Sequence, residues 1–225
     1  MPQVNIFQWH TGRGWLVLSG GGPWDSEDVV TIEAHVLGHT LSQGPLVYIW
    51  AAGDIEIADR HMDSLRDLGA RTGYLLDLLT EEEDALFEQI GEAGVLVLGD
   101  GPQPDVLRDA LPGVALRGME AAFDRGATVY AVGRSAAIFG AHAFQSDHAL
   151  PGLDWLHDAI VVPGYTPDQA DQLRAQVWEH SASYGLGLAQ GAAIALGGSG
   201  QVEVWGNAQI TVSLGPRHVP GESGG

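Results

Sequence analysis

Short apolar runs alternate with amphipathic segments along the first 132 residues of the chain. Each run holds four or five residues and ends at a turn or loop, and helically spaced residues follow it. Runs that are apolar on both faces are typical of strands in a parallel sheet covered by helices. Expected strands cover 15–19, 46–50, 72–76, 95–98 and 128–132. One expected helix begins at 25–28, and four others cover 56–68, 80–90, 104–111 and 116–125. The pattern therefore predicts a doubly wound α/β fold with a mostly parallel sheet flanked by helices.

Two local signals sharpen this expectation. Thr80 and Glu83 have the spacing of a capping box for the helix at 80–90. Two period-two segments, 201–205 and 209–213, lie on either side of Gly206-Asn207, which predicts a closing antiparallel β-hairpin.

The C-terminal third also contains expected strands at 159–162 and 192–196 and a helix at 167–181. We expect one domain over residues 1–215 and a flexible tail at 216–225, where proline and glycine are frequent.

The composition excludes several classes of function. The formal net charge is −19, which disfavours nucleic acid and anionic membranes as partners. The chain has no lysine and no cysteine, so a Ser–Lys dyad, a thiolate nucleophile and a cysteine-bound metal are all excluded. We expect a cytoplasmic protein, because no signal-peptide pattern or membrane-length apolar run is visible. We expect no cofactor. A homodimer remains open.

Small residues gather where several expected strands end. Gly20–Gly22, Gly99–Gly101 and Ser135 each follow a strand, and ligands of parallel sheets bind at these carboxyl ends. Ser135 is expected at the corner between strand 128–132 and a helix starting at Ala136. A serine at such a corner can be a nucleophile, or it can simply cap an ordinary helix.

The order of several segments resembles peptidase family S51, which includes cyanophycinase and peptidase E and has a class I glutamine-amidotransferase-like fold. The segments are 15–22, 98–101, 133–137, 152–161 and 185–188. This resemblance implies a serine-type peptidase or amide hydrolase acting on a small peptide or amide. It implies Ser135 as the nucleophile and backbone N–H groups near Asp100, Gly101 and Ala136 as the oxyanion hole. It also places Gly21 and Gly22 in the substrate-binding loop.

The same alignment lacks a general base. The family's His-Phe pair falls on Gly164-Tyr165, which are then expected at the rim of the pocket. Among the other histidines, His148 is the best candidate for a relocated base, because its neighbour Asp147 could orient it. Without a base, the alternative is a catalytically degenerate protein that binds a ligand or partner on the same scaffold.

Two further features have more than one interpretation. Arg134 lies beside the expected nucleophile and could bind a substrate carboxylate, or it could pair with one of the chain's own acids. His35 and His39, four residues apart on a helix, could share a metal, but no third ligand has diagnostic spacing. We therefore expect a solvated helix face there and no metal site.

Overall fold

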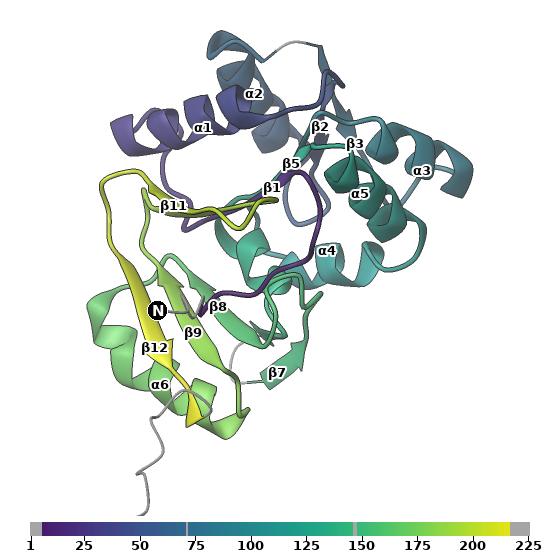
Figure 1. The fold of residues 1–225 in the computed structure, drawn as a ribbon. Helices are drawn as coiled ribbons and strands as arrows, with labels where there is room; N and C mark the ends of the chain where they lie inside the picture. Colours follow the sequence, from purple (N-terminus) through teal and green to yellow (C-terminus); the bar gives the residue numbers. More distant parts are fainter. Residues whose placement is uncertain (1–5, 71, 146–147, 217–225) are drawn as a thin grey trace, which may run out of the picture.

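The computed structural model describes residues 6–70, 72–145 and 148–216, without the side chains of Gln145 and His148. Two sheets organise these residues, as Figure 1 shows. The larger sheet has the order β11-β10-β1-β5-β4-β2-β3. Its strands are β1 (Trp15–Ser19), β2 (Leu46–Ile49), β3 (Gly73–Leu76), β4 (Val95–Leu98), β5 (Thr128–Ala131), β10 (Ala193–Gly197) and β11 (Val202–Trp205).

The first five strands of the larger sheet are parallel, and β10 and β11 extend it in antiparallel fashion. Helices cover both faces of the sheet, because the strand residues that point to either face are apolar. One face packs against α1 (Glu27–His39) and α2 (Ile55–Asp67), and the other against α3 (Glu83–Gly91), α4 (Pro104–Ala110) and α5 (Val114–Asp124). The predicted mixed α/β fold with a mostly parallel central sheet is confirmed.

A second sheet, in the order β12-β9-β8-β6-β7, was not expected. It consists of β6 (His142–Gln145), β7 (His148–Pro151), β8 (Ala159–Pro163), β9 (Tyr184–Leu188) and β12 (Ile210–Leu214). The helical segment after β8 divides into η2 (Pro167–Gln169) and α6 (Ala170–Glu179). Leu173 and Val177 of α6 pack against Ile160 and Tyr165. This sheet therefore has its own small apolar core.

The predicted C-terminal hairpin is wrong. β11 pairs with β10 in the larger sheet, whereas β12 pairs with β9 in the second sheet. The chain leaves β11 through Gly206, which has a φ of +83°. Period-two alternation identifies a strand with two different faces, but it does not identify the strand's partner. The last two strands therefore join the two sheets instead of pairing with each other.

Two helix starts also differ from the prediction. α3 begins at Glu83, and the hydroxyl of Thr80 donates to Asp77 Oδ2 at 3.0 Å instead of capping the helix. After β5, the chain enters the 3₁₀ helix η1 (Gly133–Phe139) directly after Val132. The helix expected from Ala136 thus begins three residues earlier, and Ser135 lies inside it. Of the expected tail at 216–225, all but Pro216 lies outside the described residues.

Candidate functional site

A cavity of about 760 Å³ lies at the carboxyl ends of the parallel strands. This is the edge where the sequence predicted a pocket, and turns that follow β1, β4 and β5 contribute to its wall. The lining includes Gly22, Trp24 and Asp25 after β1, Tyr48 of β2, His61 of α2, Asp100 and Gly101 after β4, and Arg134 after β5.

The carboxylate of Asp100 is held by two backbone amides. Its Oδ1 accepts the N–H of Gly101 at 2.8 Å and the N–H of Arg134 at 2.9 Å. Hydrogen bonds to an ionised oxygen are stronger than neutral ones, and two donors that converge on one oxygen resemble an oxyanion hole. An acidic side chain of the protein itself thus occupies the position where these amides meet.

Gly133 allows this close arrangement. It has a φ of +55°, a region that side chains rarely adopt, and a Cβ built on it would lie 2.4 Å from Asp100 Cγ and Oδ2. Gly21, with a φ of +75°, approaches from the other side, and its built Cβ would lie 3.1 Å from the Cα of Gly133. The turns after β1, β4 and β5 therefore meet where two glycines leave room.

Ser135 does not line the cavity. It is fully buried, and its Oγ donates to the backbone carbonyl of Gly99 at 2.5 Å. Within the described residues, no histidine is hydrogen-bonded to this hydroxyl. Ala136 is also buried, and the two converging amides belong to Gly101 and Arg134. As it stands, the Ser135 hydroxyl ties η1 to the end of β4.

Gly164 and Tyr165, two further predicted site residues, are not part of the cavity lining. Gly164 follows β8, is exposed, and has a φ of +65° with open space around its built Cβ. Tyr165 is buried in the second sheet, where its ring packs on Gly187. His148 begins β7, but its side chain and Asp147 lie outside the described residues.

Arg134 lines the main cavity, as do the predicted residues Gly22, Asp100 and Gly101. Its exposed side chain lines the main cavity and also a second cavity of about 260 Å³, next to Phe144 and Pro163. Among the described residues, its guanidinium forms no ion pair or hydrogen bond, although its backbone N–H is bonded to Asp100. A positive charge is therefore available between the two cavities.

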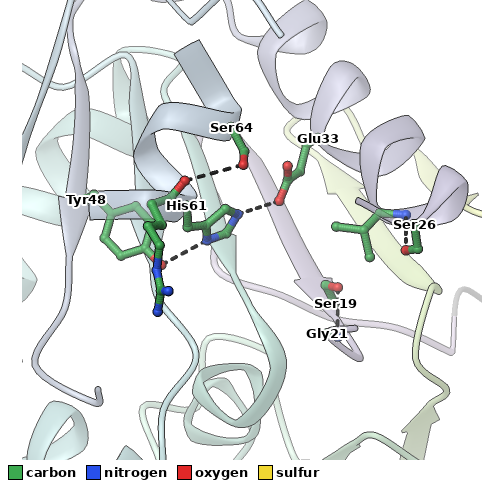
Figure 2. A network of polar contacts seen from close by, with 9 residues as sticks. Ser19, Gly21, Ser26, Glu33, Tyr48, His61 and Ser64 are labelled. Atoms are coloured by element: carbon green, nitrogen blue, oxygen red, sulfur yellow. Dashed lines mark hydrogen bonds and ion pairs between the residues drawn. The ribbon is translucent and has the colours of Figure 1, made fainter. Parts of the chain in front are cut away.

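A chain of buried polar side chains reaches the main cavity through Tyr48 and His61, and Figure 2 shows this chain from close by. His61 Nε2 lies 2.6 Å from Glu33 Oε1, and His61 Nδ1 lies 2.9 Å from the hydroxyl of Tyr48. The exposed fractions of Glu33, His61 and Tyr48 are 0%, 1% and 2%. The ring of Trp24 stacks on His61, with centroids 5.0 Å apart and an angle of 5° between the planes.

Sequence reasoning missed this chain because its three members come from α1, α2 and β2. No local spacing joins positions 33, 48 and 61. Burial raises the pKa of Tyr48 above its ordinary value, and the negative charges of Glu33 and Asp100 raise it further. The phenol therefore remains protonated at neutral pH.

The histidine pair on α1 packs against aromatic rings. The rings of His35 and His39 lie 5.1 Å and 4.9 Å from the ring of Trp205, measured between centroids. Glu33, on the same helix, is bonded to His61. In the described ranges, no group of three histidines or acids is placed to hold a metal ion, and no helix is both long and apolar enough to cross a membrane.

Comparison with known proteins finds similar solved structures. A peptidase from an acI-B1 actinobacterium superposes with a TM-score of 0.73 at 18% sequence identity, over 90% of this chain and 91% of that chain. A protein from Listeria monocytogenes EGD-e, provisionally assigned as peptidase E, superposes with a TM-score of 0.65 at 15% identity, over 88% and 100%. No family model and no curated protein matches the chain. The similarity shows a shared fold.

Proposed function

We propose that this protein binds a small peptide or amide ligand in the cavity at the strand ends, on a peptidase-like scaffold that lacks the serine nucleophile. The observation that carries the proposal is the conformation of Gly133. It follows the last strand of the parallel core almost directly and has a φ of +55°. That is the sharp strand-to-helix turn at which a nucleophile elbow presents its reactive side chain.

The amide that follows Gly133 supports this assignment. In a nucleophile elbow, the N–H of the residue after the nucleophile is one donor of the oxyanion hole. Here the N–H of Arg134 shares Asp100 Oδ1 with the N–H of Gly101. By this reasoning Gly133, and not Ser135, takes the place of the nucleophile. Glycine has no side chain, so the elbow carries no reactive group.

Loss of the general base agrees with this proposal. The alignment with the S51 family puts a glycine at position 164, where the family has its histidine. Gly164 is exposed, and nothing lies within 4 Å of its built Cβ, so this position has no imidazole. A serine without a base is a weak nucleophile near neutral pH. The missing nucleophile and the missing base thus favour binding over serine-type hydrolysis.

Arg134 suggests how a ligand is held. Its guanidinium can form a bidentate pair with a carboxylate, such as the C-terminus of a short peptide. The acidic surface repels anions at long range, so a carboxylate would depend on this local charge. We therefore expect the ligand to carry both a carboxylate, which pairs with Arg134, and a positive group, which the acidic surface attracts. We expect neither nucleic acid nor a membrane as partner.

Serine-type peptide or amide hydrolysis is the second candidate function. Two convergent amides of the oxyanion-hole type favour it, as does the fold shared with structures described as peptidases. This mechanism requires Ser135 Oγ to leave the carbonyl of Gly99 and to reach a base such as His148. It also requires Asp100 to leave the amides.

Active-site labelling separates the two candidates. The wild-type protein and Ser135→Ala are treated with a fluorophosphonate, and adducts are mapped by mass spectrometry. We expect no adduct on Ser135 and no hydrolysis of dipeptide amides, whereas an adduct on Ser135 would refute the proposal. A thermal-shift screen of short peptides tests binding, and we expect Arg134→Met to weaken the binding of free acids more than that of the matched C-terminal amides.

A further inference from the structure

The hydrogen-bonded chain of Glu33, His61 and Tyr48 reaches the cavity at a place away from the Gly133 turn. Its contacts of 2.6 Å and 2.9 Å join an acid, an imidazole and a hydroxyl in that order. A hydroxyl within hydrogen-bonding reach of a base, which is itself oriented by a third group, is the general signature of an activated nucleophile. The chain ends at Tyr48, which lines the cavity.

With Glu33 ionised and the imidazole neutral, the two hydrogen bonds fit only one tautomer of His61. An ionised Glu33 can only accept, so the Nε2 of His61 carries the proton in that bond. In the neutral imidazole, Nδ1 is then an acceptor, and the hydroxyl of Tyr48 must donate to it. This is the direction in which a proton would move if the phenol oxygen reacted.

We propose that Glu33, His61 and Tyr48 form a catalytic triad in which the Tyr48 hydroxyl is the nucleophile toward an acyl-type electrophile bound in the cavity. This activity goes beyond the proposed binding function and does not use Ser135. In the step, Tyr48 Oη forms a bond to the electrophilic atom, while its proton passes to His61 Nδ1. Glu33 stabilises the resulting imidazolium, which returns the proton to the leaving group as the bond to that group breaks. Water, deprotonated by His61, then attacks the acyl group and breaks its bond to Tyr48 Oη, and the imidazolium returns the proton to the phenol oxygen.

The surroundings of Tyr48 suit this role. Gly99 has no side chain, and a Cβ at that position would lie 2.5 Å from the Tyr48 hydroxyl, so the glycine leaves room for the phenol. Trp24 covers the ring of His61 and shields it from water. The guanidinium of Arg134 lines the same cavity and can face negative charge that develops on the electrophile.

The raised pKa of Tyr48 makes the base necessary. Because burial and the charges of Glu33 and Asp100 keep the phenol protonated, reaction as a free phenolate is disfavoured. His61 removes this obstacle by accepting the proton during bond formation, as a histidine does for a serine hydroxyl. The rate of reaction at Tyr48 should therefore depend strongly on His61.

An aryl sulfonyl fluoride, which sulfonylates activated phenols with loss of fluoride, tests the triad in the full chain. Labelling rates are measured by mass spectrometry with site mapping for wild type, Tyr48→Phe, His61→Gln and Tyr74→Phe. We expect the adduct on Tyr48 and roughly a hundredfold slower labelling in His61→Gln, because glutamine can bond to the phenol but cannot take its proton. Tyr74 lies on the neighbouring strand β3, and Tyr74→Phe is the matched control that should label like the wild type.

The outcomes separate this proposal from the proposed function. Labelling of Tyr48 at an unchanged rate in His61→Gln, or labelling of other tyrosines without Tyr48, would overturn the triad. An adduct on Ser135 would refute the proposed function but would leave the result at Tyr48 to be judged separately. If His61→Gln does not fold, Glu33→Gln serves in its place, and slower labelling of Tyr48 is again the expected result.

Discussion

The carboxylate of Asp100 lies where a side chain on Gly133 would have to begin. A built Cβ at Gly133 is only 2.4 Å from Asp100 Cγ, and real Cβ atoms are not found at such a distance. The two positions thus depend on each other. With glycine at 133, the carboxylate can reach the amides of Gly101 and Arg134.

We predict that Gly133→Ala destabilises the protein by about 3 kcal/mol or more, since alanine combines a disfavoured backbone with a steric clash. Gly164→Ala is the matched control, with a φ of +65° but nothing within 4 Å of its built Cβ. It should cost only about 1–2 kcal/mol. Urea unfolding measures both, and equal losses would show that the contact with Asp100 has no role.

A double-mutant cycle tests the dependence directly. Asp100→Ala removes the carboxylate and leaves space beside Gly133, so Gly133→Ala should cost less in that background than in the wild type. We predict a coupling of about 1 kcal/mol or more, which is within the range for residues in contact. Additive losses within about 0.5 kcal/mol would contradict this prediction.

We predict that Ser135→Ala lowers the free energy of unfolding by about 1 kcal/mol, the usual worth of one buried hydrogen bond. The change removes the bond from Ser135 Oγ to the carbonyl of Gly99, and ligand binding should stay the same. Unfolding and thermal-shift binding measurements on the same preparation check the two parts. A loss of ligand binding at unchanged stability would show that Ser135 takes part in ligand binding.

Sequence reasoning located the parallel core because local patterns determine it. The runs that became β1, β2, β4 and β5 are apolar on both faces, and the turns after β1, β4 and β5 do meet at the cavity. The second sheet was missed because β6 and β7 are short and lie beyond the expected helix at Ala136. The partner of each C-terminal strand depends on tertiary packing, which alternation does not encode.

The site was harder to predict than the fold. Gly-x-Ser drew attention to Ser135, but the backbone turns sharply two residues earlier, at Gly133, and only the φ angle reveals this. The acid Asp100 was expected to offer its backbone, yet its side chain occupies the converging amides. Arg134 was expected beside a nucleophile; it lines the cavity, and its N–H bonds Asp100.

The buried pair of Glu33 and His61 should be costly to break. His61→Phe leaves the acid buried without its partner, and we predict a loss of about 3–5 kcal/mol in the free energy of unfolding. Asp63→Asn is the control, because it alters the exposed pair with Arg66 on the same helix and should cost less than about 1 kcal/mol. Similar losses in both variants would mean that the buried pair contributes no more to stability than the exposed pair does.

The tyrosines predict how stability responds to alkali. Burial is the largest cause that raises the pKa of Tyr48, Tyr130 and Tyr184 above 10.0, and nearby negative charges raise it further. Above about pH 10 the unfolded chain loses these protons while the folded chain keeps them. The unfolded state then binds fewer protons, so the free energy of unfolding must fall as pH rises. Stability from this source is complete below pH 10 and is lost progressively above it.

Each such tyrosine contributes a slope of about 1.4 kcal/mol per pH unit above its unfolded pKa. Tyr184 lies in the second sheet and outside the cavity lining. Tyr184→Phe removes one such tyrosine, so the free energy of unfolding of the variant should fall by about 1.4 kcal/mol per pH unit less than that of the wild type. Urea unfolding at several pH values between about 9 and 11.5 measures both slopes, and tyrosinate absorbance follows ionisation. If the free energy of unfolding does not fall above about pH 10, or if Tyr184→Phe leaves the slope unchanged, burial does not hold the pKa of these phenols above the ordinary value.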